Sequence, residues 1–174
     1  MKAITLFFLM TLPIFVFSQN ENFTFTKDGL SEYVVVEIDS ISEKELYSKT
    51  LNWVKETYIK PEQVIDATIE NESIRVTGKS NFFRIYNAFG DFKDYPVKYT
   101  IKISFKKGKY KFEVLSLSVE HDSVNYSDIP SKIYKKNGEL LKWYKDTPLK
   151  IEDFFNQLNT SLKGYIIKNE KSDW

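Results

Sequence analysis

The chain has a single histidine, His121, which stands between Glu120 and Asp122. A histidine beside a carboxylate is a common general base or metal ligand, because the carboxylate orients the imidazole ring. Side chains alternate between the two faces of a strand, however, so both carboxylates point away from His121 if the preceding strand continues. We therefore predict that His121 is a surface residue at the end of a hairpin.

No other residue pattern indicates catalysis. The chain has no cysteine, and a single histidine is too few for a typical zinc site. It contains no Gly-x-Ser-x-Gly elbow, phosphate-binding loop or His-Glu-x-x-His helix. We predict no catalytic residue, no cofactor and no metal, in a protein that is not an enzyme. The alternative is an envelope hydrolase that uses His121 or a pair of carboxylates brought together by folding.

Aromatic residues in a long connection are the candidate binding residues. Within residues 122–146 they are Tyr126, Tyr134, Trp143 and Tyr144. Connections often lie on the surface and carry function, and flat rings can stack on sugars or fill a pocket of a partner. The alternative is that this segment folds back over a sheet edge or a helix and buries the rings.

Residues 1–18 have the pattern of a signal peptide. A lysine at position 2 precedes a nearly unbroken apolar run, and Ser18 supplies the small residue before the cleavage point. The run contains Pro13 and is shorter than the roughly 20 residues that span a bilayer. We predict export to the periplasm or the extracellular space, with no membrane span after cleavage.

Charge limits the partners of the exported chain. The sequence has 25 Lys and Arg against 24 Asp and Glu, and one of the lysines lies in the signal segment. The mature chain is therefore neutral. Binding of nucleic acid by bulk charge requires a basic excess, so we predict no nucleic-acid partner.

The clearest structural element is a long hairpin over residues 96–121. Apolar residues occupy every second position from Val97 to Phe105, and Lys107-Gly108-Lys109 forms the turn. On the return strand the apolar positions change phase after Val114, which predicts a bulge there.

Other elements precede and follow this hairpin. Ser42 and Glu45 form a capping box, with Ile41 and Leu46 as a hydrophobic staple, so a helix begins there. The remaining predicted elements are a strand at 33–38, strands at 64–70 and 74–78 that form a hairpin, an aromatic-rich connection at 79–95 with the strand reaching Ile85 at most, and a final helix at 148–168 capped by Thr147.

Two details of these elements bear on the fold. In the strand at 64–70, Ile65, Ala67 and Ile69 alternate with polar residues and are expected to face the core. In the connection 122–146, Asn137-Gly138 fits the turn of a hairpin or a turn before a short helix.

The order of elements predicts the fold class. It is β-α-β-β-β-β-α, and one mostly antiparallel five-stranded sheet with both helices packed on one face covers every apolar surface. We predict a single α+β domain over residues 31–170, preceded by a polar leader at 19–30.

Four segments resemble a known family. They are Tyr33 to Val36, the helix from Glu45 to Val54 with its Leu51-Asn52-Trp53 step, the strand from Ile74 to Lys79, and Lys107 to Tyr110. Together they resemble a family of secreted bacterial domains of unknown function with a TATA-binding-protein-like fold, over residues 33–120. The family has no known catalytic residues, so the resemblance implies a fold and transfers no site.

The fold name does not establish DNA binding. The TATA-binding protein uses its open sheet face on DNA, and fold analogy alone is not evidence of function. Here the open face is predicted to mix basic and acidic residues: Arg75, Lys98, Lys102, Lys106 and Lys111 with Asp66, Glu70 and Glu113. We predict a solvated, mixed-charge face on an exported, non-enzymatic binding or interaction module of the cell envelope, whose partner is an envelope protein or a glycan.

Overall fold

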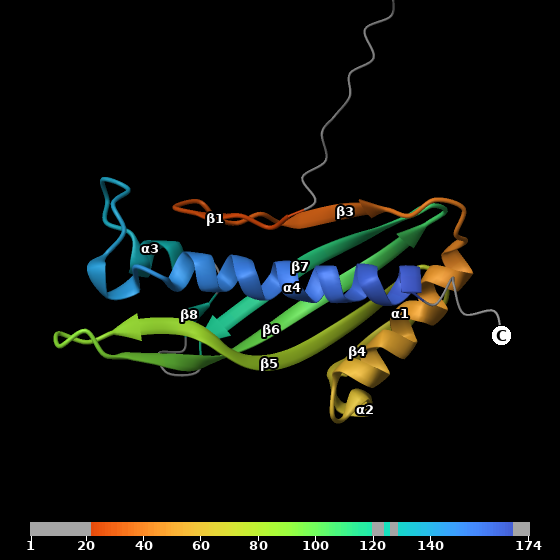
Figure 1. The fold of residues 1–174 in the computed structure, drawn as a ribbon, viewed down its shortest axis with the longest axis horizontal. Helices are drawn as coiled ribbons and strands as arrows, with labels where there is room; N and C mark the ends of the chain where they lie inside the picture. The colour runs from red at the N-terminus through yellow and green to blue at the C-terminus, as the bar shows by residue number, and fades with distance from the viewer. Residues whose placement is uncertain (1–21, 120–123, 126–128, 169–174) are drawn as a thin grey trace, which may run out of the picture.

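One antiparallel sheet with helices on one face forms the framework of the protein (Figure 1). The computed structural model describes residues 22–119, 124–125 and 129–168. The strands of the sheet lie in the order β3-β7-β6-β5-β4, and a short strand, β8, pairs with β7. The predicted α+β class and five-stranded antiparallel sheet are confirmed.

The elements have the following bounds. The strands are β1 Phe25–Thr26, β2 Gly29–Leu30, β3 Tyr33–Glu37, β4 Ile65–Ile69, β5 Ser73–Tyr86, β6 Phe92–Lys106, β7 Lys109–Val119 and β8 Val124–Asn125. The helices are α1 Glu43–Thr57, α2 Pro61–Val64, α3 Ile129–Ile133, the 3-10 helix η2 Lys142–Tyr144 and α4 Thr147–Lys168.

Helix α1 begins where the sequence predicts. The hydroxyl of Ser42, the N-cap, accepts a hydrogen bond from the Glu45 backbone N–H at 3.2 Å. Ile41 and Leu46, the predicted staple, are both buried. The same corner anchors the β6–β7 turn, because the carbonyl of Ile41 accepts a hydrogen bond from the Gly108 N–H at 3.0 Å. Gly108 has a φ of 76°, a conformation that favours glycine.

Helix α4 crosses the apolar face of the sheet beside α1 (Figure 1). Aromatic rings fill the centre of this contact: the ring of Phe154 stacks on Phe82 at 4.1 Å between centroids and meets Tyr99 at 5.0 Å. Trp53 of α1 is fully buried and donates its indole N–H to Ser161 at 3.1 Å. Both main helices therefore pack on one face, as predicted.

The β5–β6 hairpin is longer than predicted. Residues 79–95, expected to be a connection that extends the strand to Ile85 at most, pair along both arms up to the turn at 87–91. A register shift just before Phe83 explains the difference. The extra residue breaks the two-residue alternation, so Phe82 and Phe83 are both buried although they are adjacent.

The predicted bulge in β7 is confirmed. Thr100 faces Ser116 and Ile101 faces Val114, so the pairing skips Leu115. The extra residue leaves Leu115 45% exposed on the outside of the strand.

A second bulge, in β4, is not predicted by the sequence. The pairing skips Asp66, so Ile65 faces the helices while Ala67 and Ile69 turn to the open face. The expectation that all three apolar residues face the core is therefore wrong, and Ile69 is 55% exposed. The hydroxyl of Thr77 donates a hydrogen bond to the Asp66 carboxylate and holds the bulge.

Residues 22–30 belong to the fold, although the sequence predicts that 19–30 is a polar leader. They form the β1–β2 hairpin, with Phe23 and Phe25 buried in the core. The Phe23 N–H donates to the side-chain oxygen of Asn156 on α4 at 2.7 Å. The apolar residues here are too few and too widely spaced to produce a periodic signal, which explains why the sequence did not indicate this hairpin.

The connection before α4 combines the two predicted alternatives. A turn at Asn137-Gly138 brings Tyr134 and Leu140 into a single β-bridge, and a short 3-10 helix, η2, follows. Helix α4 then begins at Thr147, whose hydroxyl donates to a β5 carbonyl, that of Arg84, instead of capping the helix. The Asp146 carbonyl accepts the first helical hydrogen bond, from the Lys150 N–H.

Residues 1–18, the predicted signal peptide, lie outside the described residues, so export stays a prediction. None of the helices in the described part of the chain is long and apolar enough to span a bilayer.

The buried hydroxyl of Thr50 gives a test of the core. Thr50 is fully buried in α1, and its oxygen has no hydrogen-bond partner among the described residues. Because an unpaired buried polar group is costly, we expect Thr50→Val to raise the free energy of unfolding by about 1 kcal/mol. Urea unfolding followed by circular dichroism measures this, with Thr160→Val on the exposed face of α4 as control. A lower unfolding free energy for Thr50→Val would contradict the prediction.

The pair formed by Arg84 and Asp94 predicts a pH dependence. The guanidinium donates to both carboxylate oxygens at 2.7 Å and lowers the pKa of Asp94 below its ordinary value of 3.8. As the pH falls below about 5, the unfolded chain takes up this proton first, so the stabilisation present at higher pH is lost. We expect the unfolding free energy of the wild type to fall more between pH 5 and pH 2.5 than that of Asp94→Asn. Equal losses in the two proteins would show that the pair contributes nothing.

Candidate functional site

The sheet face opposite the helices is open and polar. Residues that face each other on neighbouring strands share a face of the sheet. One row across β3, β7, β6 and β5 therefore contains Tyr33, Glu113, Lys102 and Arg75, and the next contains Val35, Lys111, Ser104 and Ser73.

Basic residues oppose one another on this face. The register pairs Lys79 with Lys98, Arg75 with Lys102, and Lys106 with Lys109. Like charges directly opposite on neighbouring strands destabilise a sheet. Acidic residues offset part of this charge, since Glu113 also faces Lys102 and Glu37 also faces Lys109. The chain has a formal net charge of only +1, and this small total conceals a basic face.

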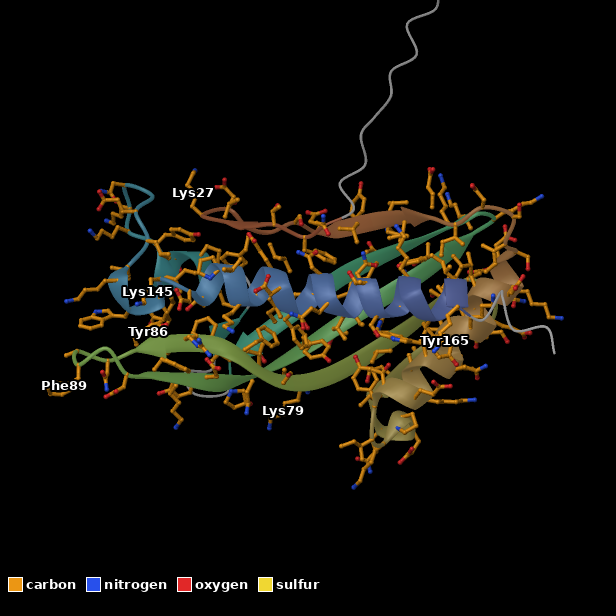
Figure 2. The ribbon with its side chains drawn as sticks, viewed as in Figure 1. Lys27, Lys79, Tyr86, Phe89, Lys145 and Tyr165 are labelled. Carbon is orange, nitrogen blue, oxygen red and sulfur yellow. The ribbon has the colours of Figure 1, made fainter. Side chains whose placement is uncertain are left out.

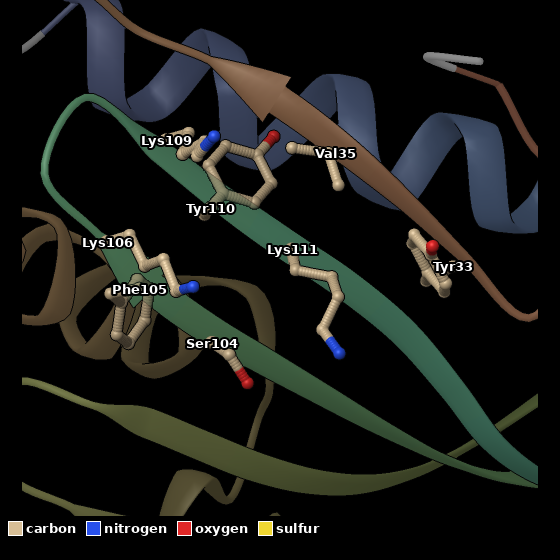
Figure 3. A pocket seen from close by; sticks show the side chains of 8 residues that line it. All are labelled: Tyr33, Val35, Ser104, Phe105, Lys106, Lys109, Tyr110 and Lys111. Atoms are coloured by element: carbon tan, nitrogen blue, oxygen red, sulfur yellow. The ribbon is translucent and has the colours of Figure 1, made fainter. Parts of the chain in front are cut away.

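A cavity of ≈ 460 Å³ lies on this face, between β3 and the β6–β7 turn. Its lining consists of Tyr33, Val35, Ser104, Phe105, Lys106, Lys109, Tyr110 and Lys111. We call it the lysine pocket. Figure 3 shows Lys106, Ser104 and Lys111 projecting from β6 and β7 beside one another, with Tyr33 on β3 at the far end.

The three lysines of the lysine pocket differ in whether they form an ion pair. The ammonium group of Lys111 lies 2.7 Å from the Glu113 carboxylate and 5.3 Å from the centre of the Tyr33 ring. Lys106 and Lys109 form no ion pair with any of the described residues. The side chain of Tyr33 is half exposed. The pocket therefore combines two cations not engaged in ion pairs, a hydroxyl group and an accessible ring.

This arrangement suits an anion attached to a flat or ring-shaped body. Lysine ammonium groups bind carboxylate, sulfate or phosphate oxygens as point charges. An exposed tyrosine ring offers an apolar face for stacking. Among the described residues, no group of three His, Cys, Asp or Glu side chains could hold a metal ion.

Comparison with known proteins places this fold in a family. A family model described as a domain of unknown function (DUF4468) with a TBP-like fold matches residues 33–120. The chain belongs to this family. The match covers the segment in which the sequence resemblance was found, and that prediction is confirmed. No curated protein matches the chain.

Two solved structures share the fold of this DUF4468 protein. One is a DUF4468 family protein from Bacteroides ovatus ATCC 8483, with a TM-score of 0.60 and 14% identity over 80% of this chain and 86% of that one. The other is a TBP-like protein from Parabacteroides distasonis ATCC 8503, with a TM-score of 0.55 and 18% identity over 77% of this chain and 90% of that one. At these identities the similarity concerns the fold.

Of the predicted aromatic binding residues of this DUF4468 protein, Tyr134, Trp143 and Tyr144 do not line the lysine pocket. Tyr134 is half buried and packs against the core, and burial raises its pKa. Tyr144 also packs against the core, with its ring 5.9 Å from that of Phe83. Trp143 is half buried, with the Lys142 ammonium 4.0 Å from its ring centre. Tyr126 lies outside the described residues, and a binding role for the four stays a prediction.

The predictions about catalysis are not tested by this geometry. His121 and its neighbours Glu120 and Asp122 lie outside the described residues. The absence of an enzymatic activity and the alternative of an envelope hydrolase both stay predictions.

Sequence reasoning missed part of the lysine pocket. It assigned Lys106 and Lys111 to the open face, and alternation along the strand placed Ser104 there too, but it did not assign Tyr33 or Lys109. The sequence pattern alone does not indicate that β3 pairs with β7, and this pairing places Tyr33 beside the lysines. A correct strand order would have placed Tyr33 beside these lysines.

The opposed lysines of the pocket predict a stability effect. Replacing Lys106 by Glu converts the Lys106–Lys109 pair into an opposite-charge pair next to the turn. We expect Lys106→Glu to raise the unfolding free energy by roughly 0.2–1 kcal/mol, with a smaller gain at high salt. Urea unfolding at two salt concentrations measures it. A loss of stability at low salt would contradict the repulsion described above.

Proposed function

We propose that this protein is a non-enzymatic binding module that recognises an anionic glycan in the lysine pocket. The observation that carries the proposal is that Lys106, Lys109 and Lys111 line one cavity together with the exposed ring of Tyr33. A sugar that bears a carboxylate or sulfate group combines the anion and the ring that this lining would bind.

The size and shape of the pocket support a small saccharide unit. Ligand pockets commonly have volumes of about 300–1,000 Å³, and the lysine pocket, with ≈ 460 Å³, lies within this range. Single-stranded nucleic acid is usually held by several aromatic side chains that stack on successive bases. Three aromatic residues line the lysine pocket, but Phe105 and Tyr110 are buried and only Tyr33 is exposed for stacking. The lining therefore favours a glycan over a nucleic acid.

The predicted export of the chain agrees with such a partner. If residues 1–18 act as a signal peptide, the domain reaches the compartment that contains envelope glycans. Binding would weaken as salt is added, because dissolved ions screen the attraction between exposed charges. At physiological ionic strength this attraction decays over a Debye length of about 8–10 Å.

Calorimetric titration of the full chain with an oligogalacturonate tests the proposal. We expect the triple variant Lys106→Gln, Lys109→Gln and Lys111→Gln to weaken binding by at least about tenfold, the equivalent of one lost charge-assisted contact. A matched variant removes three exposed lysines from other surfaces: Lys44→Gln, Lys55→Gln and Lys136→Gln. It should bind as the wild type does.

Neutral and nucleic-acid probes distinguish the possible ligands. A maltooligosaccharide of the same length should bind more weakly than the oligogalacturonate, and raising the salt from about 50 to 500 mM should weaken binding of the acidic probe. The proposal fails if the acidic oligosaccharide does not bind or if the two triple variants lose affinity equally. It also fails if a single-stranded oligonucleotide binds more tightly through the same lysines.

A further inference from the structure

A second concave region lies on the other side of the sheet, where α1 ends beside α4. It is a groove of ≈ 520 Å³ between the end of α1, helix α2, helix α4 and strands β5 and β6. We call it the tyrosine groove. Its apolar lining includes Val64, Phe154 and Leu158, which pack against the core but are not fully covered.

Two tyrosine hydroxyls meet in this groove. The oxygens of Tyr58 and Tyr99 lie 3.1 Å apart, and either can donate to the other. Burial raises the pKa of both phenols above the ordinary value of 10.0, so both carry a proton at neutral pH. One of the two hydroxyl protons forms the hydrogen bond between Tyr58 and Tyr99. Among the described residues, no group accepts the second proton.

The position of Tyr99 depends on a glycine. Its ring lies over Gly78 of β5, and a Cβ atom at Gly78 would be 2.4 Å from the Tyr99 oxygen, too close for any side chain. Glycine in a strand often marks a close approach of another group. Here it allows the Tyr99 hydroxyl to reach Tyr58 at the groove.

The rim of the groove is both apolar and cationic. Ile59 follows Tyr58 and is 99% exposed, and Lys60 comes next. A fully exposed isoleucine beside apolar lining extends the surface on which an apolar chain can lie. Lys60 places a positive charge at the same rim.

We propose that the tyrosine groove binds a single-chain amphiphile with a carboxylate head group, such as a medium-chain fatty acid. The carboxylate accepts the free O–H of the tyrosine pair, and the chain lies against Phe154 and Leu158. Lys60 adds electrostatic attraction for the head group. This site lies on the helix side of the sheet and does not depend on the lysine pocket.

Titration of the full chain with dodecanoate, followed by calorimetry, tests the proposal. We expect the double variant Tyr58→Phe and Tyr99→Phe to bind dodecanoate about tenfold more weakly, because both hydroxyls are lost while the rings remain. The control is Tyr47→Phe on α1, which lines neither the tyrosine groove nor the lysine pocket and should bind as the wild type does. Thermal unfolding of each variant checks that the fold is retained.

A second probe tests the head group. The wild type should prefer dodecanoate over dodecyltrimethylammonium, which has the same chain and the opposite charge, and the double variant should lose most of this preference. The triple lysine-to-glutamine variant of the lysine pocket should leave dodecanoate binding unchanged. The proposal is overturned if the wild type shows no preference between the two probes or if the double variant binds dodecanoate as tightly as the wild type.

Discussion

Burial of the apolar sheet face beneath α4 is the interaction on which the rest of the structure depends. Strands β5, β6 and β7 present a continuous apolar surface, and α4 lies across it with Phe154 and Phe155 at the centre of an aromatic cluster. The hairpin of β1 and β2 and the indole of Trp53 attach to the same helix. Without α4, the apolar sheet face, the β1–β2 hairpin and Trp53 of α1 would lose the surface on which they pack.

Much of this fold can be predicted because its strongest signals are local. The N-cap at Ser42 and the phase change after Val114 each involve residues a few positions apart, and each is confirmed. The errors arise where local periodicity is interrupted. The bulge at Asp66 and the register shift before Phe83 each add one residue to a strand, and every side chain beyond them changes face.

The candidate site was harder to predict because it is a product of strand order. Lys106 and Lys111 could be placed on the open face from alternation alone. Tyr33 joins them only because β3 pairs with β7, a contact between residues that are far apart in the sequence. Similarly, nothing in the sequence around Tyr58 indicates that its hydroxyl meets Tyr99, since this contact depends on how the end of α1 lies over β6.

The bulge in β4 also affects whether molecules of this protein associate through their sheet edges. β4 is the outermost strand on one side of the sheet, and its free backbone groups could otherwise pair with a strand of another chain. It is only five residues long, and its ladder is broken at a charged residue, Asp66. A short, bent and charged edge is a poor template for added strands. The same feature that displaces Ile69 from the core therefore protects the protein against edge-to-edge aggregation.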